Sequence, residues 1–123
     1  MSEKTVRVMV VEDEVLIGLM LVKKLRAAGY EVGDVITTGE EAVEYAGDIR
    51  PSVVLMDVTL AGRMNGIEAA RQIKDRYVTP IIFFTGYNDT LLHEQARRVD
   101  PVAILAKMDP LENILAAIRT AVS

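Results

Sequence analysis

The sequence predicts a three-layer α/β fold, in which helices cover both faces of a doubly wound, five-stranded parallel sheet. Short apolar runs without polar alternation recur along the 123 residues, as expected of strands that are buried on both faces. Longer segments with helical spacing of apolar residues separate these runs, and the connections between them are short. Because strands that alternate with helices are joined by right-handed crossovers, the strands are predicted to lie parallel.

Apolar spacing and helix caps define the elements of the first half. Residues 5–11 form the first strand, and the helix after it ends at Ala28, before a glycine suited to a left-handed C-cap. Residues 31–37 form a second strand with a weaker strand pattern, because Gly33 interrupts it, as is typical of an edge position. A threonine and a glutamate three residues apart then form a capping box that opens a helix over 38–46.

The third and fourth repeats follow the same plan. Residues 51–57 form the third strand, with four consecutive apolar residues that lead into a single aspartate. Asn65 is the predicted cap of a helix that ends near residue 77. Residues 80–85 form the fourth strand, and an asparagine at position 88 is the predicted cap of the helix over 89–99.

Residues 102–107 form the fifth strand, and the stretch 109–112 is the clearest helix start in the chain. This stretch combines an aspartate at the N-cap, a proline at the first helical position and a glutamate at the third. The first, third, fourth and fifth strands are predicted to be the most buried, and the second to be an edge. A 2-1-3-4-5 strand order satisfies this pattern and brings the ends of strands one and three together at the switch point.

Length and composition define the class of protein. The 123 residues are expected to form one domain, 1–123, and half of them are hydrophobic. No cysteine is present, which fits a cytoplasmic location and excludes a disulfide framework. The longest apolar run is far too short to span a bilayer, and the N-terminus lacks the plan of a signal peptide. With a net charge of −4 and no basic stripe, direct binding of nucleic acid is not expected, so a protein partner is favoured.

Polar side chains stand at the carboxyl ends of the predicted strands. These are Glu12 and Asp13 after the first, Asp57 after the third, Thr85 after the fourth and Lys107 after the fifth. In an open α/β sheet these ends form the ligand crevice. Three carboxylates within about 5 Å of one another repel by roughly 3 kcal/mol per pair at an effective dielectric constant of 20, so they must bind a proton or a cation. Hard oxygen ligands without histidine or cysteine select Mg²⁺ or Mn²⁺, and one or two carboxylates with waters suit Mg²⁺ especially.

Magnesium in turn predicts phosphoryl chemistry. Asp57 is a plausible nucleophile, because aspartyl phosphates are established covalent intermediates. Lys107 supplies a compact positive charge to a phosphoryl oxygen, and Thr85 supplies a hydroxyl donor to another. The residues thus predict a Mg²⁺-dependent aspartate that accepts a phosphoryl group.

These residues, each at its expected strand end, resemble the receiver domain of two-component response regulators, over essentially the whole chain. The resemblance implies a flavodoxin-like sheet and a chemotaxis-regulator-like switch, in which Asp57 takes a phosphoryl group from the phosphohistidine of a sensor histidine kinase or a phosphotransfer protein. It implies that Glu12, Asp13 and the backbone carbonyl of Thr59 help hold Mg²⁺, and that the threonine and lysine bind the phosphoryl oxygens. A downstream protein target is implied as well, with slow autodephosphorylation and no other enzymatic activity.

Some positions depart from the family pattern. Receivers usually carry an aromatic switch residue three positions before the lysine, where this chain has Ile104. Lys107 is followed by Met108 instead of the usual proline. The fourth strand is similar to that of a receiver subgroup with a Phe-x-Thr-Gly motif and no switch aromatic. Our hypothesis is that Tyr87, two residues past the threonine, is the aromatic side chain that moves in its place.

Alternatives remain open. A receiver that only docks, without being phosphorylated, would keep the fold and lose the chemistry. A small Mg²⁺-dependent phosphohydrolase would need a second acid two residues after Asp57, where this chain has Thr59. A flavin carrier would need a phosphate cradle in place of the acidic first loop. The chain is expected to be either a stand-alone regulator or a receiver from a longer protein, and it could form a homodimer.

Overall fold

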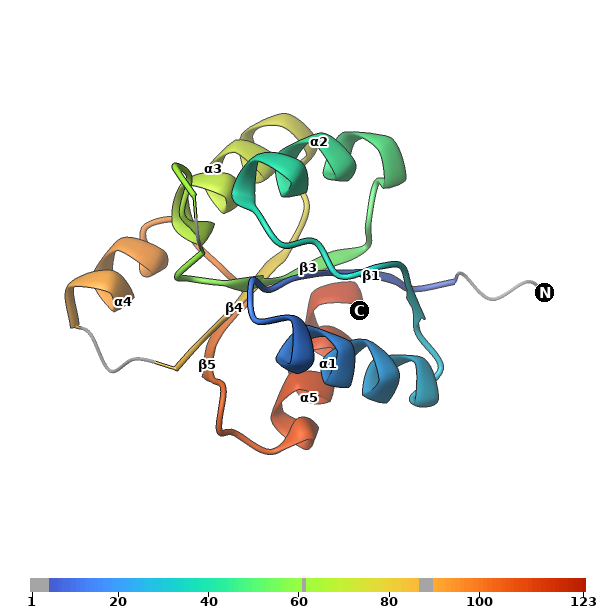
Figure 1. Ribbon diagram of the computed structural model, residues 1–123. Coiled ribbons are helices and arrows are strands. Elements are labelled where there is room, and N and C mark those ends of the chain that lie inside the picture. Colours follow the sequence, from blue (N-terminus) through green and yellow to red (C-terminus); the bar gives the residue numbers. More distant parts are fainter. Residues whose placement is uncertain (1–4, 61, 87–89) are drawn as a thin grey trace.

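The structure is a computed structural model that describes residues 5–60, 62–86 and 90–123. One parallel sheet has the strand order β2-β1-β3-β4-β5, as predicted, and helices lie on both sides of it (Figure 1). None of the helices in the described ranges has the length and apolar content needed to cross a bilayer. The elements in chain order are β1 (Arg7–Val11), α1 (Val15–Ala27), β2 (Glu31–Val32), α2 (Gly39–Ile49), β3 (Val53–Asp57), α3 (Gly66–Tyr77), β4 (Ile81–Thr85), α4 (Thr90–Arg97), β5 (Ala103–Ala106) and α5 (Leu111–Val122).

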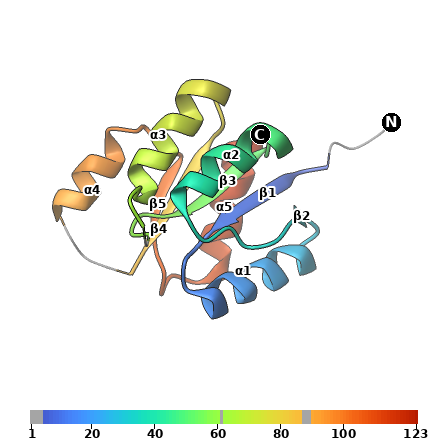
Figure 2. The same cartoon turned by 45° about the horizontal axis from the view of Figure 1, so that its top comes forward.

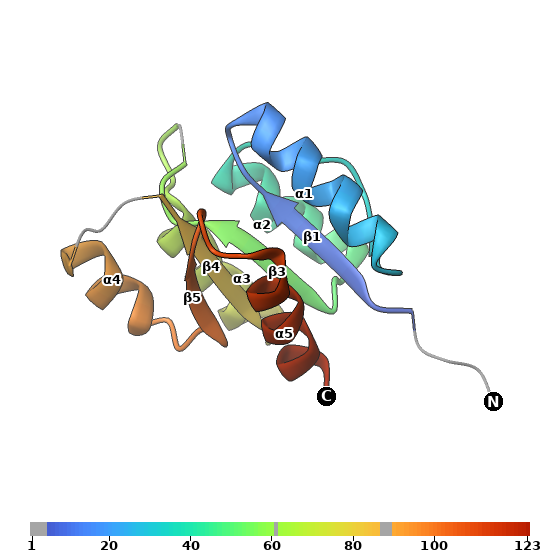
Figure 3. The same cartoon turned by 90° about the horizontal axis from the view of Figure 1, so that it is seen from below.

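The sheet separates two apolar cores. Helices α1 and α5 pack on one face (Figure 3), where Leu25 and Ile118 meet Leu55 of the sheet. The other face is covered by α2, α3 and α4, and Ile73 packs there with Met56. Every residue of β3 and β4 is buried, which explains why these strands read as continuous apolar runs. The central strands therefore hold their carboxyl ends in fixed positions for the site described below.

The second strand is shorter than predicted. The sequence predicts a strand over 31–37, but β2 has two residues beside β1 (Figure 2). Val32 pairs with Val8, and pairing resumes at a single bridge between Ile36 and Val11. The edge segment thus advances by four residues where β1 advances by three, so it contains one extra residue. The extra residue interrupts the hydrogen-bonded ladder in the segment that contains Gly33, the residue that predicted an edge strand. At the opposite edge, β5 is half-buried to exposed, which contradicts its expected place among the most buried strands.

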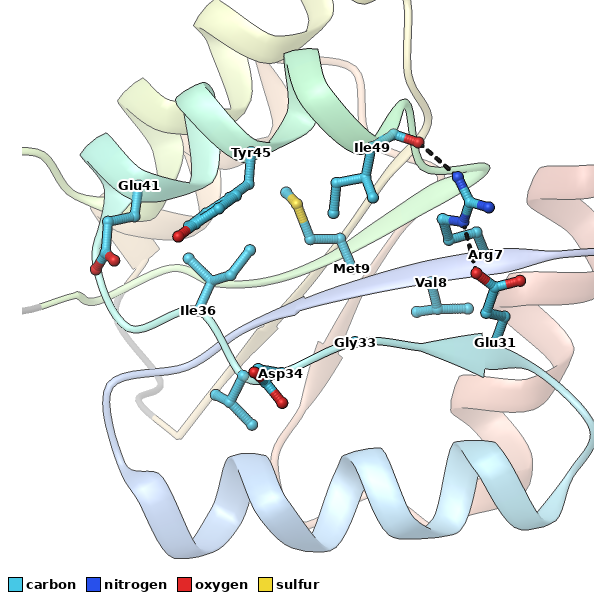
Figure 4. Close-up of a pocket in the computed structure, with 11 residues that line it drawn as sticks. Arg7, Val8, Met9, Glu31, Gly33, Asp34, Ile36, Glu41, Tyr45 and Ile49 are labelled. Carbon is cyan, nitrogen blue, oxygen red and sulfur yellow. Dashed lines mark hydrogen bonds and ion pairs between the residues drawn. The ribbon is translucent and has the colours of Figure 1, made fainter.

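A groove of about 430 Å³ follows the interrupted strand on the α2 side (Figure 4). Tyr45 and Ile49 of α2 lie over it, and Met9 of β1 forms part of its floor. At one end Arg7 bridges Ile49 O, at 2.9 Å, and Glu31 Oε1, at 3.0 Å. A Cβ atom at Gly33 would meet nothing within 4 Å, so the edge segment leaves this space unfilled.

Of the predicted helix caps, two are confirmed, one is wrong, and the one at Asn88 lies outside the described residues. Thr38 Oγ1 accepts a hydrogen bond from Glu41 N at 3.2 Å, and Asn65 Oδ1 accepts one from Glu68 N at 2.9 Å. Asp109, however, does not cap α5, because its carboxylate turns back to accept a hydrogen bond from Ala106 N at 3.0 Å. The aspartate therefore closes the turn after β5, and α5 begins at the residue after the proline.

The apolar spacing of α1 identifies the helix correctly but does not identify its buried face. The core side of α1 is formed by Gly18, Val22 and Leu25. Leu16 is 77% exposed and Leu19 is 54% exposed, so these apolar side chains face solvent. Exposed apolar side chains on an otherwise packed helix mark a candidate contact surface.

Candidate functional site

The five predicted site residues come from four strand ends that meet at one edge of the sheet. Glu12 and Asp13 directly follow β1, Asp57 ends β3, Thr85 ends β4, and Lys107 directly follows β5. Because β1 and β3 pair in register, their ends lie side by side at the predicted switch point. The Lys107 backbone N–H donates to Thr85 O at 2.9 Å, which fixes the base of the lysine beside the threonine.

Lys107 is the centre of the cluster. Its Nζ lies 3.0 Å from Asp57 Oδ2, 3.0 Å from Glu12 Oε1 and 3.2 Å from Glu14 Oε1. Burial lowers the pKa of Lys107, but the hydrogen bonds to its carboxylate partners outweigh this and hold the pKa above its usual value. Glu14 was not among the predicted site residues, although its position next to the acidic pair could have suggested it.

Glu12 is a fully buried carboxylate, with an exposed fraction of 0%. Its Oε2 accepts a hydrogen bond from Glu14 N at 3.0 Å, whereas Oε1 accepts none among the described residues and lies 3.0 Å from Lys107 Nζ. Burial, together with the neighbouring Asp57, raises the pKa of Glu12 to about 7, against the opposing effects of the Glu14 N–H and the lysine. Near neutral pH, the Glu12 carboxylate can therefore bind either a proton or a cation.

The acidic residues fit a magnesium ion. Glu12, Asp13 and Asp57 each offer one carboxylate oxygen, and these oxygens lie within 4.8 Å of one another. A buried oxygen of Glu12 without a hydrogen bond supplies a further reason for a cation here. A set made only of hard oxygen donors matches the preference of Mg²⁺. Thr59, whose carbonyl is the predicted fourth ligand, is exposed and donates its backbone N–H to Asp57 Oδ1 at 3.1 Å.

The loop after β3 packs tightly against Asp57. Asp57 is 2% exposed, and Gly66 at the start of α3 lies directly against its backbone. The Gly66 N–H donates to Val58 O at 3.0 Å, which closes the loop back onto the strand end. A side chain at position 66 would overlap the Asp57 carbonyl oxygen, so this position requires glycine.

The two switch candidates have different outcomes. Tyr87 lies outside the described residues, so the hypothesis that it moves stays a prediction. Ile104 is half-buried in β5 and packs against the core on the α4 side. Ile104, Thr85 and His93 line a cavity of about 350 Å³. An aliphatic residue at position 104 therefore leaves space next to the site threonine.

Magnesium binding is expected to depend on pH through Glu12. Its pKa is raised from 4.5 to about 7 in the folded protein, so the contribution of Glu12 to folding without metal is greatest below about pH 4.5 and falls by roughly 3 kcal/mol as pH rises through 7. Protons compete with Mg²⁺ for the same carboxylate below pH 7. We therefore expect Mg²⁺ to raise the melting temperature more at about pH 8 than at about pH 6. Thermal melts of wild type and Glu12→Gln measure this, and an equal shift at both pH values in wild type would contradict it.

Comparisons with known proteins agree on one family. The family profile described as the response regulator receiver domain matches residues 8–119. The transcriptional regulatory protein PdtaR of Mycobacterium tuberculosis is 38% identical over 117 residues, which cover 95% of this chain and 57% of that protein. The phyllosphere-induced regulator PhyR of Methylorubrum extorquens is 30% identical over 98% of this chain and 45% of its own length. The chain thus spans about half the length of these curated relatives.

Solved structures show the same architecture. The signal receiver domain of a modulated diguanylate cyclase from Desulfovibrio desulfuricans G20 superposes with a TM-score of 0.91 at 35% sequence identity. The superposition covers 97% of this chain and 94% of that one. The fold and the position of the crevice are therefore those of a receiver domain.

Proposed function

We propose, because this chain belongs to the response regulator receiver family, that Asp57 is the phosphoryl acceptor of a phosphorylation-dependent signalling switch in a two-component system. One observation carries the assignment: Asp57 is held at the carboxyl end of β3, with Oδ2 3.0 Å from Lys107 Nζ. Glu12 and Glu14 contact the same ammonium, but of these three acids only Asp57 ends a strand, and that strand is the central one of the sheet. We further propose that residues 1–123 act as one receiver domain.

Each site residue has a separate role in the proposed phosphoryl transfer. A carboxylate oxygen of Asp57 attacks phosphorus, the bond from phosphorus to the donor atom breaks, and the donor leaves with that electron pair. The Lys107 ammonium exchanges a carboxylate contact for one phosphoryl oxygen, and the Thr85 hydroxyl is placed at the next strand end to donate to another. The Thr59 N–H holds Oδ1 of the nucleophile in a fixed orientation at 3.1 Å.

Magnesium is the proposed cofactor. Glu12, Asp13 and Asp57 would hold the ion, and the Thr59 carbonyl would complete the protein ligands. When bound, Mg²⁺ supplies the positive charge that offsets the carboxylates and the developing charge on the phosphoryl oxygens. The chain contributes no other chemistry in this proposal, apart from slow loss of the phosphoryl group from its own aspartate.

Intact-mass spectrometry after incubation with Mg²⁺ and acetyl phosphate tests the acceptor assignment. We expect wild type to gain one phosphoryl mass only when Mg²⁺ is present, and Asp57→Asn to gain none, because an amide cannot act as the nucleophile. The variant keeps the shape of the side chain, so its melting temperature reports whether the fold survives. An adduct that persists in Asp57→Asn would overturn the assignment, and no adduct in wild type would favour a docking-only receiver.

The proposed donor is a phosphohistidine on a sensor kinase or phosphotransfer protein, which approaches over the exposed side of α1. The exposed residues Leu16 and Leu19 follow Glu14, which contacts Lys107 in the crevice, so this apolar surface is continuous with the site. Met108, the residue after Lys107, is 92% exposed. An exposed apolar patch at the rim of a phosphoryl site fits a protein donor better than a small-molecule donor.

Phosphotransfer profiling against a panel of autophosphorylated histidine kinases measures the role of this surface. We expect Leu16→Asp with Leu19→Asp to lose at least about tenfold in transfer rate from any kinase that serves wild type, because buried apolar contacts at an interface are replaced by charges. The rate with acetyl phosphate, measured at about 0.5 M salt so that the added charges are screened, should stay unchanged. Val78→Asp, which adds a charge at an 83% exposed position at the end of α3, is the matched control. Normal transfer to the double variant would place the donor elsewhere.

A further inference from the structure

Glu14 is a charged residue at the rim of the crevice that the proposed chemistry leaves without a role. It is the N-cap residue of α1, yet its side chain caps no backbone N–H of the helix. Instead, Oε1 lies 3.2 Å from Lys107 Nζ, and the side chain is 61% exposed. Its backbone N–H donates to Glu12 Oε2 at 3.0 Å, so the residue is anchored to the floor of the site while its carboxylate faces the entrance.

The position of Glu14 affects two steps of phosphoryl transfer. A donor phosphoryl group must approach Asp57 past a carboxylate that is not among the proposed metal ligands and so keeps its negative charge when the ion is bound. Lys107 must also exchange a carboxylate contact for a phosphoryl oxygen, and Glu14 competes for the same ammonium. Both effects oppose a donor in proportion to the negative charge that it carries.

We propose that Glu14 discriminates among phosphodonors by charge, slowing small anionic donors and leaving the site to a protein donor that places a cation against its carboxylate. This inference rests on the proposed acceptor function of Asp57. Glu14 does not touch the reacting atoms in this scheme and acts through Lys107 and through its field at the entrance. The exposed apolar side of α1 begins next to Glu14, so a docked protein would cover it.

Phosphorylation rates with two small donors of different charge provide the test. Acetyl phosphate is a dianion at neutral pH, whereas phosphoramidate is a monoanion, and both transfer the same phosphoryl group to Asp57. At saturating Mg²⁺ and low salt, we expect Glu14→Gln to accelerate acetyl phosphate about three- to tenfold and phosphoramidate clearly less. Glu14→Lys should extend the same trend. The gain should appear mainly in KM for the donor, and it should shrink at about 0.5 M salt, because screening weakens the field at the entrance.

The controls separate this role from a structural one. Glu44→Gln removes the same charge from an exposed position on α2, away from the crevice, and should leave both rates unchanged. A variant that only loosened the fold would change both donors equally and without salt dependence, and that result would overturn the inference. Equal rates in wild type and Glu14→Gln, with a normal adduct in both, would also overturn it while leaving the acceptor function intact. No adduct in wild type would overturn both.

Discussion

Gly66→Ala is expected to lower the free energy of unfolding by at least about 3 kcal/mol and to abolish most phosphorylation of Asp57. A Cβ atom at position 66 would overlap the Asp57 carbonyl oxygen and lie 3.1 Å from Met56 Cγ. The backbone of β3 is buried between its neighbours, so it cannot shift without breaking its pairing with β1 and β4. The overlap must therefore be relieved by movement of the loop after β3, and that movement displaces Asp57, the proposed acceptor.

Urea unfolding and the acetyl phosphate mass assay measure the two consequences of this substitution. Gly33→Ala is the matched control, because its added methyl group meets nothing within 4 Å, and we expect it to stay within about 0.5 kcal/mol of wild type. If Gly66→Ala had wild-type stability and a wild-type rate, the close approach of α3 to Asp57 would be wrong.

Lys107→Met is expected to reduce the phosphorylation rate by roughly a hundredfold, because it removes the cation that we propose binds a phosphoryl oxygen. It also leaves Asp57 and Glu12 without the ammonium that lies 3.0 Å from each. In metal-free buffer at about pH 8, we expect a loss of about 3 kcal/mol in unfolding free energy. Mg²⁺ should restore more stability to the variant than to wild type, since it becomes the remaining cation at the cluster.

Urea unfolding with and without Mg²⁺ measures this difference, and Lys23→Met is the control. Lys23 is an exposed lysine of α1, so its loss tests the effect of one fewer positive charge on the chain. Equal stabilisation of Lys107→Met and wild type by Mg²⁺ would show that the lysine and the ion do not share the same carboxylates.

Much of the fold and the positions of the proposed site residues could be predicted from the sequence. The central strands are buried on both faces, so their apolar runs and the polar residues that end them are visible without a structure. The caps at Thr38 and Asn65 were equally visible, because each is a local pattern in which side chain and backbone lie within four residues. Asp109 showed the limit of such patterns, since its carboxylate found a competing donor in the turn before it.

Features that depend on non-local packing were not predictable in the same way. The apolar spacing of α1 is consistent with more than one buried face, and only contact with the sheet selected Leu25 for the core and left Leu16 in solvent. The length of β2 depended on whether an extra residue could be accommodated opposite β1. The requirement for glycine at position 66 arises from a strand end that folds back against the start of a helix.

The identity of the crevice residues was determined by the sequence, because each stands at the end of an apolar run and parallel strands bring such ends to one edge. The relations among these residues were decided only by the tertiary structure. Lys107 contacts carboxylates from two other segments, and burial raises the pKa of Glu12. Both effects arise because side chains up to 95 positions apart in the sequence lie together in one poorly hydrated space. Distance and solvent exposure are properties of the folded chain, so the acidic run could suggest Glu14 as a site residue but could not show its contact with Lys107.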